Sequence, residues 1–199
     1  LISPVVWTTI ATGVPPEQHG VLDFLEPDPA GGPPHPVSAA SRKVPPLWEI
    51  AAAAGRSTAV IGWWATFPAA APPGGTVYSD RLTEQLIGLE GNVPGLADPP
   101  AAGVAAAELA VRAAVVTAAM LAPLATVSQD ELQRAQGQEG GWDQPVGGLA
   151  KLWGATLTVE RLTDRELARG TALVLSYLEG TDVVGHLFAS YRPPAMPGV

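Results

Sequence analysis

An aspartate and a histidine four positions apart, near the end of the chain, are the residues best suited to chemistry. Asp182 and His186 stand in a run that begins at Tyr177, and Gly185 lies between them. A carboxylate oxygen and a neutral imidazole nitrogen form the kind of ligand pair that binds zinc or manganese. Because glycine tolerates backbone conformations that other residues avoid, we expect a sharp turn at Gly185 that points both side chains at one divalent ion. The alternative is an aspartate that caps a helix beside a surface histidine.

A serine at the other end of the chain precedes a short apolar segment. The sequence predicts a helix over residues 4–12, with Ser3 as its N-cap, Pro4 in its first turn and Gly13 as its left-handed stop. The free N–H groups of a first helical turn favour a phosphate or sulfate, here next to the Ser3 hydroxyl. The alternative is that Ser3 only caps the helix.

Taken together, the two segments resemble the type I phosphodiesterase/nucleotide pyrophosphatase branch of the alkaline phosphatase superfamily. The family pattern has a nucleophilic Ser or Thr, a helix ending in Thr-Gly, then Pro and His-Gly, and much later a metal-binding Asp and His. The matching residues are Ser3, Thr12, Gly13, Pro15, His19, Gly20, Asp182 and His186. Residues 42–48, 60–68 and 79–81 match further family segments in the same order.

The resemblance implies metal-dependent hydrolysis of phosphate esters. Two divalent ions, zinc or else manganese or another divalent ion, would lie about 4 Å apart and clamp the attacking and leaving oxygens. Ser3 takes the place of the nucleophile. The resemblance implies that it is also a metal ligand, and metal binding would lower the pKa of its hydroxyl. Asp182 and His186 take the place of two ligands of the ion that activates water.

Substrate contacts follow from the same resemblance. Many family members carry an Asn three residues after the nucleophile, where this chain has Val6. Pro4 has no N–H to donate, so the phosphate contacts would fall to the N–H groups of Val5 and Val6. Trp64 would form a wall near the site, or stack against a nucleobase or an aromatic leaving group.

Several groups of the family pattern are missing from the chain. The family has an Asp on a strand just upstream of the nucleophile, whereas the chain starts two residues before Ser3. It also has a downstream Asp-His-Gly segment, but no Asp-His pair occurs here, and His19 and His35 do not match ligand positions. We therefore expect residues 1–199 to be a partial catalytic domain, without the first strand and the C-terminal metal-binding half. Such a chain would hydrolyse phosphodiesters very poorly on its own. The alternative is a non-catalytic, truncated or degenerate relative that keeps the fold and binds at most one metal weakly.

Charge and composition narrow the class of partner. The formal net charge is −8 and no basic run occurs, which argues against nucleic acid as a bulk partner. A small phosphoester substrate remains compatible because metal ions supply positive charge. The apolar stretch 101–127 contains Glu108 and Arg112, spaced as an i,i+4 pair, so it predicts an amphipathic helix with a break near Pro123 and not a membrane span.

Strands that alternate with helices predict an α/β fold: a mostly parallel sheet with helices on both faces, alkaline-phosphatase-like but incomplete. We expect strands at 57–62 and 171–178, parallel in one sheet, and Ser3 in the same cleft as Asp182 and His186. The expected helices are 4–12, 46–54, 102–121, 128–136 and 149–168, and the expected loops are 25–41, 68–76, 88–100 and 137–148. Three polar residues receive structural roles: Asp80 pairs with Arg81 or caps a turn, His19 orders the turn after the first helix, and His35 is solvated.

Overall fold

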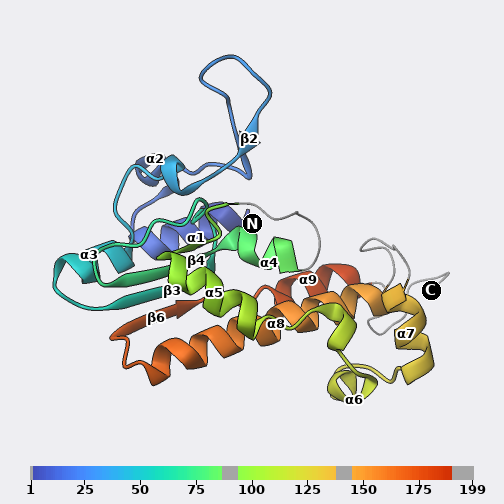
Figure 1. The fold of residues 1–199 in the computed structure, drawn as a ribbon. Coiled ribbons are helices and arrows are strands. Elements are labelled where there is room, and N and C mark those ends of the chain that lie inside the picture. The colour runs from blue at the N-terminus through green and yellow to red at the C-terminus, as the bar shows by residue number, and fades with distance from the viewer. Residues whose placement is uncertain (1, 87–93, 138–144, 190–199) are drawn as a thin grey trace.

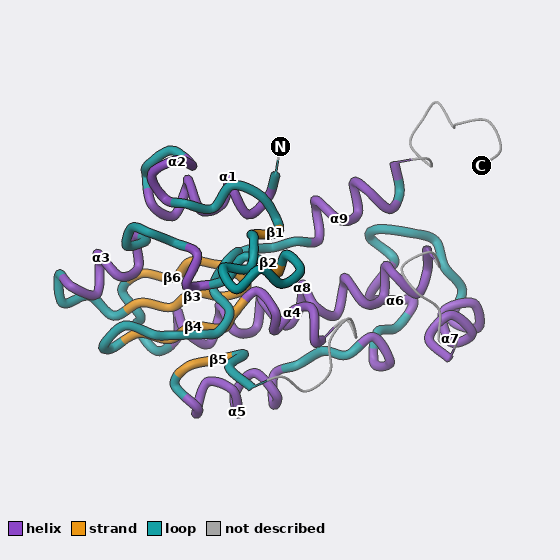
Figure 2. The backbone as a smooth tube through the Cα atoms, turned by 90° about the horizontal axis from the view of Figure 1, so that it is seen from above, coloured by secondary structure: helices purple, strands orange, loops and turns teal. Residues whose placement is uncertain are grey.

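A mixed four-stranded sheet forms the centre of the molecule in the computed structural model, which describes residues 2–86, 94–137 and 145–189 (Figure 1). Its strands are β3 (Thr58–Trp63), β4 (Gly75–Ser79), β5 (Ala97–Asp98) and β6 (Leu173–Ser176). They lie in the order β5-β4-β3-β6 (Figure 2). Strand β3 is parallel to both β4 and β6, whereas β5 is antiparallel to β4. The predicted parallel pairing of segments 57–62 and 171–178 is therefore confirmed.

Helices cover both faces of this sheet, as predicted. One face packs against α1 (Ser3–Thr12) and α3 (Leu47–Ala53), through a cluster that includes Val60 and Trp48. The other face packs against α4 (Asp80–Leu86), α5 (Pro100–Leu109) and α8 (Pro145–Ala168), through a cluster that includes Ile61 and Leu162. Successive residues of a strand point to opposite faces, and all six residues of β3 are buried, as expected for a strand covered on both sides.

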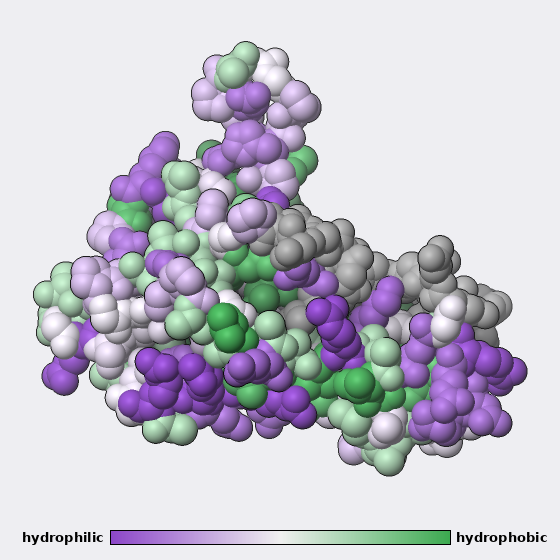
Figure 3. Space-filling model, in the orientation of Figure 1, coloured by the Kyte–Doolittle hydropathy of each residue, from purple (hydrophilic) through white to green (hydrophobic). Residues whose placement is uncertain are grey.

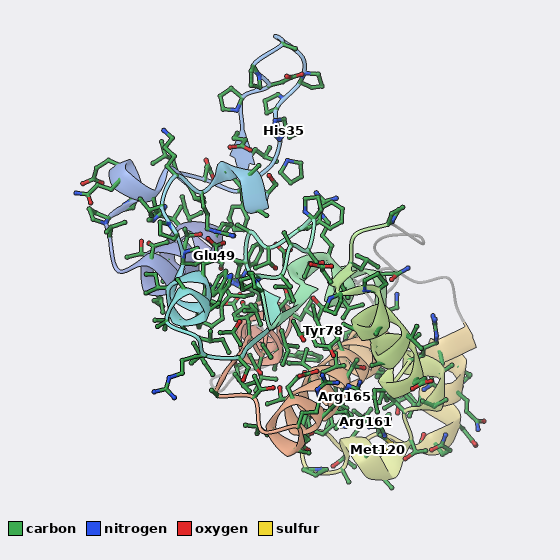
Figure 4. All side chains as sticks on the ribbon, turned by 60° about the vertical axis from the view of Figure 1, so that its left-hand side comes forward. His35, Glu49, Tyr78, Met120, Arg161 and Arg165 are labelled. Carbon is green, nitrogen blue, oxygen red and sulfur yellow. The ribbon has the colours of Figure 1, made fainter. Side chains whose placement is uncertain are left out.

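A segment between α1 and α3 projects away from the sheet (Figure 1). It contains α2 (Pro16–His19), β1 (Leu25–Glu26), β2 (His35–Pro36) and a 3-10 turn at Ala39–Ser41. Strands β1 and β2 form a two-residue antiparallel ribbon within the segment predicted as a loop. His35 is exposed on this projection, as predicted (Figure 4).

His19 holds the turn after α1, which confirms its predicted role. The ring is fully buried; its Nδ1 accepts a hydrogen bond from Val21 N–H at 3.2 Å, and its Nε2 lies 3.0 Å from Thr9 Oγ1. Because the Thr9 hydroxyl already donates to the Val5 carbonyl, Nε2 must carry the proton. His19 is thus neutral, with both ring nitrogens paired.

A helical cluster lies beyond the sheet, around the N-terminal half of α8. It contains α6 (Ala118–Leu121), α7 (Gln129–Gly137), a 3-10 turn at Ala113–Val115 and α9 (Gly180–Leu187). Figures 1 and 2 both place α6 and α7 away from the sheet, at the far end of α8. Hydrophobic residues reach the surface near α6 (Figure 3). Ser128 caps α7 by accepting a hydrogen bond from the Glu131 N–H at 3.2 Å.

The prediction of one helix over 102–121 is wrong. Helix α5 ends at Leu109, and the backbone at Ala110 is extended. Val111 N–H donates to Thr158 Oγ1 at 2.8 Å, and the Val111 carbonyl lies so close to Gly154 that a Cβ there would be 2.3 Å away. This tertiary contact with α8 overrides the helix propensity of the alanines. Arg112 therefore lies beyond the end of α5 and does not share a helix face with Glu108.

Other boundaries differ less. Strand β4 begins at Gly75, inside the segment 68–76 that was predicted as a turn region, and α8 begins at Pro145, four residues earlier than expected. The predicted helix 46–54 is found as α3, and Gly55 follows it with a φ of 75°. Parts of the predicted loops 88–100 and 137–148 lie outside the described residues, as does segment 190–199.

Candidate active site

Helix α1 places Ser3 at its first position, which leaves the Ser3 hydroxyl free. The N-cap is Ile2, in an extended conformation, with no side-chain capping bond, so the expectation that Ser3 caps the helix is wrong. Within the described part of the chain, no residue hydrogen-bonds to Ser3 Oγ. The helix ends as predicted, at Gly13 with a left-handed φ of 70°.

Trp7 fixes the start of α1 against the sheet. It lies one turn after Ser3, so both side chains lie on one side of the helix. Its ring makes edge contacts with Trp63 and Tyr177, with centroids 5.1 Å and 4.8 Å away, and its carbonyl accepts a hydrogen bond from Trp63 Nε1 at 3.1 Å. Trp63 ends β3 and Tyr177 follows β6, so these contacts place Ser3 at the carboxyl edge of the parallel strands. This edge is where open α/β sheets bind ligands.

Helix α9 carries Asp182 and His186 to the same edge. Tyr177 N–H continues the sheet by donating to the Ile61 carbonyl at 2.9 Å, and the chain then turns into α9. The sharp turn expected at Gly185 is wrong, because Gly185 lies inside α9. The helix itself brings the two side chains together: residues four apart lie on one helix face, and Asp182 Oδ1 is 3.8 Å from His186 Nε2.

Ser3 and Asp182 line one open pocket, although they come from opposite ends of the sequence. The pocket has a volume of about 480 Å³ and is lined by Ser3, Trp7, Ser176, Tyr177, Leu178, Thr181 and Asp182. His186 lies one turn further along α9 and is not among these lining residues. Sequence reasoning did not assign Trp7, Tyr177 or Thr181 to the site. For Trp7 a signal existed, because it follows Ser3 by four residues in a predicted helix.

Acidic groups set the electrostatics of this edge. Burial raises the pKa of Glu179, and the negative charges of Asp182 and Asp80 raise it further. Burial also raises the pKa of the Tyr177 hydroxyl. The negative charges around Glu179 favour a bound cation, because a cation relieves their repulsion.

Asp80 lies near this edge, but both of its carboxylate oxygens face hydrogen-bond donors of the protein. Its Oδ2 accepts the Ala65 N–H at 2.8 Å, and its Oδ1 lies 3.4 Å from the Thr66 hydroxyl. Ala65 has a left-handed φ of 57°, and its carbonyl accepts a hydrogen bond from Arg42, so both backbone groups of this strained residue are held. Burial raises the pKa of Asp80, and hydrogen bonds from the backbone N–H groups of Ala65, Arg81 and Phe67 oppose this rise. The predicted turn-capping role is confirmed.

The residues predicted to contact the substrate, Val5, Val6 and Trp64, are less accessible to a ligand than Ser3 and Asp182. The N–H groups of Val5 and Val6 both donate to the Ile2 carbonyl at 3.1 Å, so a phosphate contact would require these hydrogen bonds to be exchanged. Trp64 packs between Phe24 and Tyr177, with ring centroids 5.7 Å and 6.3 Å away. Trp64 thus backs the pocket through Tyr177 and does not line it.

The donor set fits a divalent ion in part. Asp182 and His186 offer a carboxylate and an imidazole that are 54% and 82% exposed, so both can reach a metal without rearrangement of the core. No cluster of three or more Asp, Glu, His or Cys with metal-binding geometry occurs within residues 2–86, 94–137 and 145–189. Two ligands on one helix face can hold one ion, and Ser3 is the remaining candidate ligand at the pocket.

No helix of the described residues is both long and apolar enough to cross a membrane. The stretch 101–127, which composition alone could suggest as a span, is divided among α5, a 3-10 turn and α6.

Comparison with known proteins identifies the family. A family model described as type I phosphodiesterase / nucleotide pyrophosphatase matches residues 2–197 of the 199-residue chain. Neither the curated proteins nor the solved structures gave a significant match. Because the family match spans nearly the whole sequence, the chain belongs to the type I phosphodiesterase/nucleotide pyrophosphatase family, and this membership indicates hydrolysis of phosphoesters.

Proposed function

We propose that this chain supplies the nucleophile and one metal-ligand pair of a metal-dependent phosphoester hydrolase, of the phosphodiesterase, nucleotide pyrophosphatase or phosphatase type. The observation that carries the proposal is the shared pocket: a serine with a free hydroxyl and an exposed aspartate line it together. The pocket also lies at the carboxyl edge of a parallel sheet, where the fold leaves room for a ligand.

Ser3 is the group that reacts in this proposal. Its Oγ attacks the phosphorus, the Oγ–P bond forms as the bond to the leaving oxygen breaks, and the hydroxyl proton leaves with the departing alcohol or passes to water. Water then hydrolyses the Ser3 phosphoester and restores the hydroxyl. Because Ser3 Oγ has no partner within the described residues, it needs no rearrangement before it attacks.

Asp182 and His186 hold a cation beside the phosphate. A bound divalent ion supplies positive charge to the phosphate oxygens and lowers the pKa of a bound hydroxyl or water. Zinc suits the mixed oxygen and nitrogen donors, and manganese is the second candidate. The chemistry implied by the family uses two such ions, and their further ligands would come from residues other than those assigned here.

The test uses the full-length product of the gene that encodes this chain. Hydrolysis of bis(p-nitrophenyl) phosphate should stop on chelation and return with zinc or manganese. Ser3→Ala should lower kcat by at least about a thousandfold, because no other group can form the covalent intermediate. Asp164→Asn, at an exposed position on α8, is the matched control and should retain the parent rate. If Ser3→Ala stays within a few-fold of the parent, Ser3 is not the nucleophile.

A second candidate is a non-catalytic relative that binds at most one metal weakly. The observation that favours it is the ligand count, because the described residues offer only one Asp–His pair on α9. Equilibrium dialysis with zinc separates the two. Tight binding of two ions per full-length chain, with turnover, supports the hydrolase, whereas weak binding of one ion without turnover supports the alternative.

A further inference from the structure

Two adjacent apolar pockets lie between α8, α9 and the turn that follows α6. The smaller has a volume of about 210 Å³ and the larger about 450 Å³. Leu124, Leu149 and Val184 line both, so we treat them as one apolar groove. The smaller pocket is walled almost entirely by carbon, from residues that include Leu152 and Trp153. Water in such a space finds few hydrogen-bond partners, so an apolar group is the favoured occupant.

The groove adjoins the candidate active-site pocket. Leu178 and Thr181 line both the smaller apolar pocket and the pocket that holds Ser3 and Asp182. These two residues stand where β6 leads into α9, so the route from the phosphate site to the groove crosses this junction. A single molecule that passes over Leu178 can therefore occupy both spaces.

Helix α9 separates a polar face from an apolar one. Asp182 and His186 share one face, whereas Val184 and Phe188, four positions apart, pack against the helical cluster. Gly185 lines the larger pocket, and the space beside it is open, because a Cβ at this position would have no neighbour within 4 Å. One helix thus carries the metal-ligand candidates and a wall of the groove.

We propose that the substrate is a phosphoester with an apolar chain, such as an alkyl or acyl group, which lies in the groove while its phosphate lies between Ser3 and Asp182. This inference rests on the proposed function, because it assigns the substrate class of the same site. The two lining residues that the pockets share, Leu178 and Thr181, favour a substrate group over a separate ligand. The groove would bind the chain by removing methylene groups from water.

A series of O-alkyl p-nitrophenyl phosphates tests the inference on the full-length protein. The alkyl group is varied from methyl through butyl to octyl, while the reacting bond stays the same. Each methylene that enters the groove should raise kcat/KM by about fourfold, since burying one CH₂ contributes about 0.8 kcal/mol, until the groove is full.

Leu124→Asp is the variant that places a charge at the groove. Leu124 is 53% exposed, so the fold should tolerate the change. We expect it to lower kcat/KM for the octyl ester by at least about tenfold and to leave the methyl ester unchanged. Leu167→Asp is the matched control, because Leu167 has a similar exposure but lies at the opposite end of α8. An equal loss on both esters in Leu124→Asp would overturn the inference.

Binding of octyl phosphate and methyl phosphate, measured by calorimetry, separates this inference from the proposed function. If the methyl ester is hydrolysed but neither rate nor affinity rises with chain length, the groove assignment fails and the hydrolase stands. If no ester is hydrolysed, but octyl phosphate binds at least about tenfold more tightly than methyl phosphate and Leu124→Asp removes the difference, the groove stands and the hydrolase fails. If no ester is hydrolysed and the two phosphates bind alike, both fail.

Discussion

Two aspartates and two histidines of this chain occupy opposite environments. His19 is buried and Asp80 is largely enclosed, and each uses its polar atoms on nearby protein groups. Asp182 and His186 are 54% and 82% exposed, and Asp182 Oδ1 lies 3.8 Å from His186 Nε2. Asp80 and Asp182 even follow strands that flank the same strand, β3.

The difference shows that position at a sheet edge does not by itself make a ligand. Asp80 accepts hydrogen bonds from the strained segment at Ala65 and holds that segment in place, so it has little capacity left for a metal. Asp182 projects from α9 into an open pocket with free oxygen lone pairs. Hydrogen-bond satisfaction therefore separates structural carboxylates from candidate functional ones.

The largest expected difference between the two aspartates is in activity. Asp182→Asn should lower the metal-dependent kcat/KM of the full-length protein by at least about a hundredfold, because it removes the charged oxygen that we propose as a ligand of the cation. Asp80→Asn should reduce it far less per folded molecule, as measured with bis(p-nitrophenyl) phosphate after correction for the folded fraction. Equal losses in the two variants would remove the functional distinction.

The free energy of unfolding should be affected in the reverse order, more by a change at Asp80 than by one at Asp182. Asp80→Ala should lower the free energy of unfolding by about 2 kcal/mol, because the Ala65 N–H loses its buried acceptor. Asp182→Ala should change it by less than about 0.5 kcal/mol, as is usual for an exposed surface residue. Urea unfolding followed by circular dichroism measures both. A large loss in Asp182→Ala would show that Asp182 supports the fold.

The pH dependence of stability sharpens the comparison for the histidines. Burial lowers the pKa of His19, so the folded protein binds this proton less readily than the unfolded chain does. Stability should therefore fall as the pH decreases through 6.5, the ordinary histidine value, towards the lower pKa of the folded state. The slope for one such group is at most about 1.4 kcal/mol per pH unit.

His19→Gln is the variant that tests this dependence. Glutamine cannot be protonated in this range, so the pH dependence due to position 19 should disappear, even if overall stability is lower. Protonation of the native ring would place a proton on Nδ1 and break its hydrogen bond from Val21 N–H. A parent and a variant with identical pH profiles between about pH 7 and 5 would contradict the buried neutral histidine.

The carboxylate Asp80 should show a pH dependence of the opposite sign. Because burial raises its pKa, the folded state holds this proton more strongly than the unfolded chain. The contribution of Asp80 to stability should therefore decrease as the pH rises from 3.8, the ordinary aspartate value, to the higher pKa of the folded state, and then stay constant. The parent should lose stability relative to Asp80→Asn over this window in urea titrations at several pH values. A gain over the same window would contradict the assignment.

Local signals were enough to predict the elements that build the site. Gly13 and Gly55 follow α1 and α3 as left-handed stops, and the apolar strands at 57–62 and 171–178 pair in parallel as expected. That Asp182 and His186 form a metal-ligand pair stays a prediction, which rests on their residue types and spacing and on the exposure of both side chains. These features depend on short-range chemistry, which the sequence displays directly.

The failures come from contacts between distant segments. The alanines after Leu109 favour helix, but the bond from Val111 N–H to Thr158 ends it, and that partner lies far along the chain. Gly185 suggested a turn because glycine is common in turns. The sequence spacing alone did not show that the residues around it form helix α9. The groove beside α9 was not predicted at all, because its walls come from the separate segments α8, α9 and the turn at Leu124.

Detection of a covalent phosphoester on Ser3 tests the central claim most directly. The full-length protein is mixed with bis(p-nitrophenyl) phosphate and zinc, quenched in acid within one turnover, and digested for mass spectrometry of the peptide that contains Ser3. We predict a p-nitrophenyl phosphoryl adduct on Ser3 that is absent without metal and strongly reduced in Asp182→Asn. Metal-dependent turnover by Ser3→Ala at the parent rate, with no adduct on Ser3 of the parent, would contradict the assignment of Ser3 as the nucleophile.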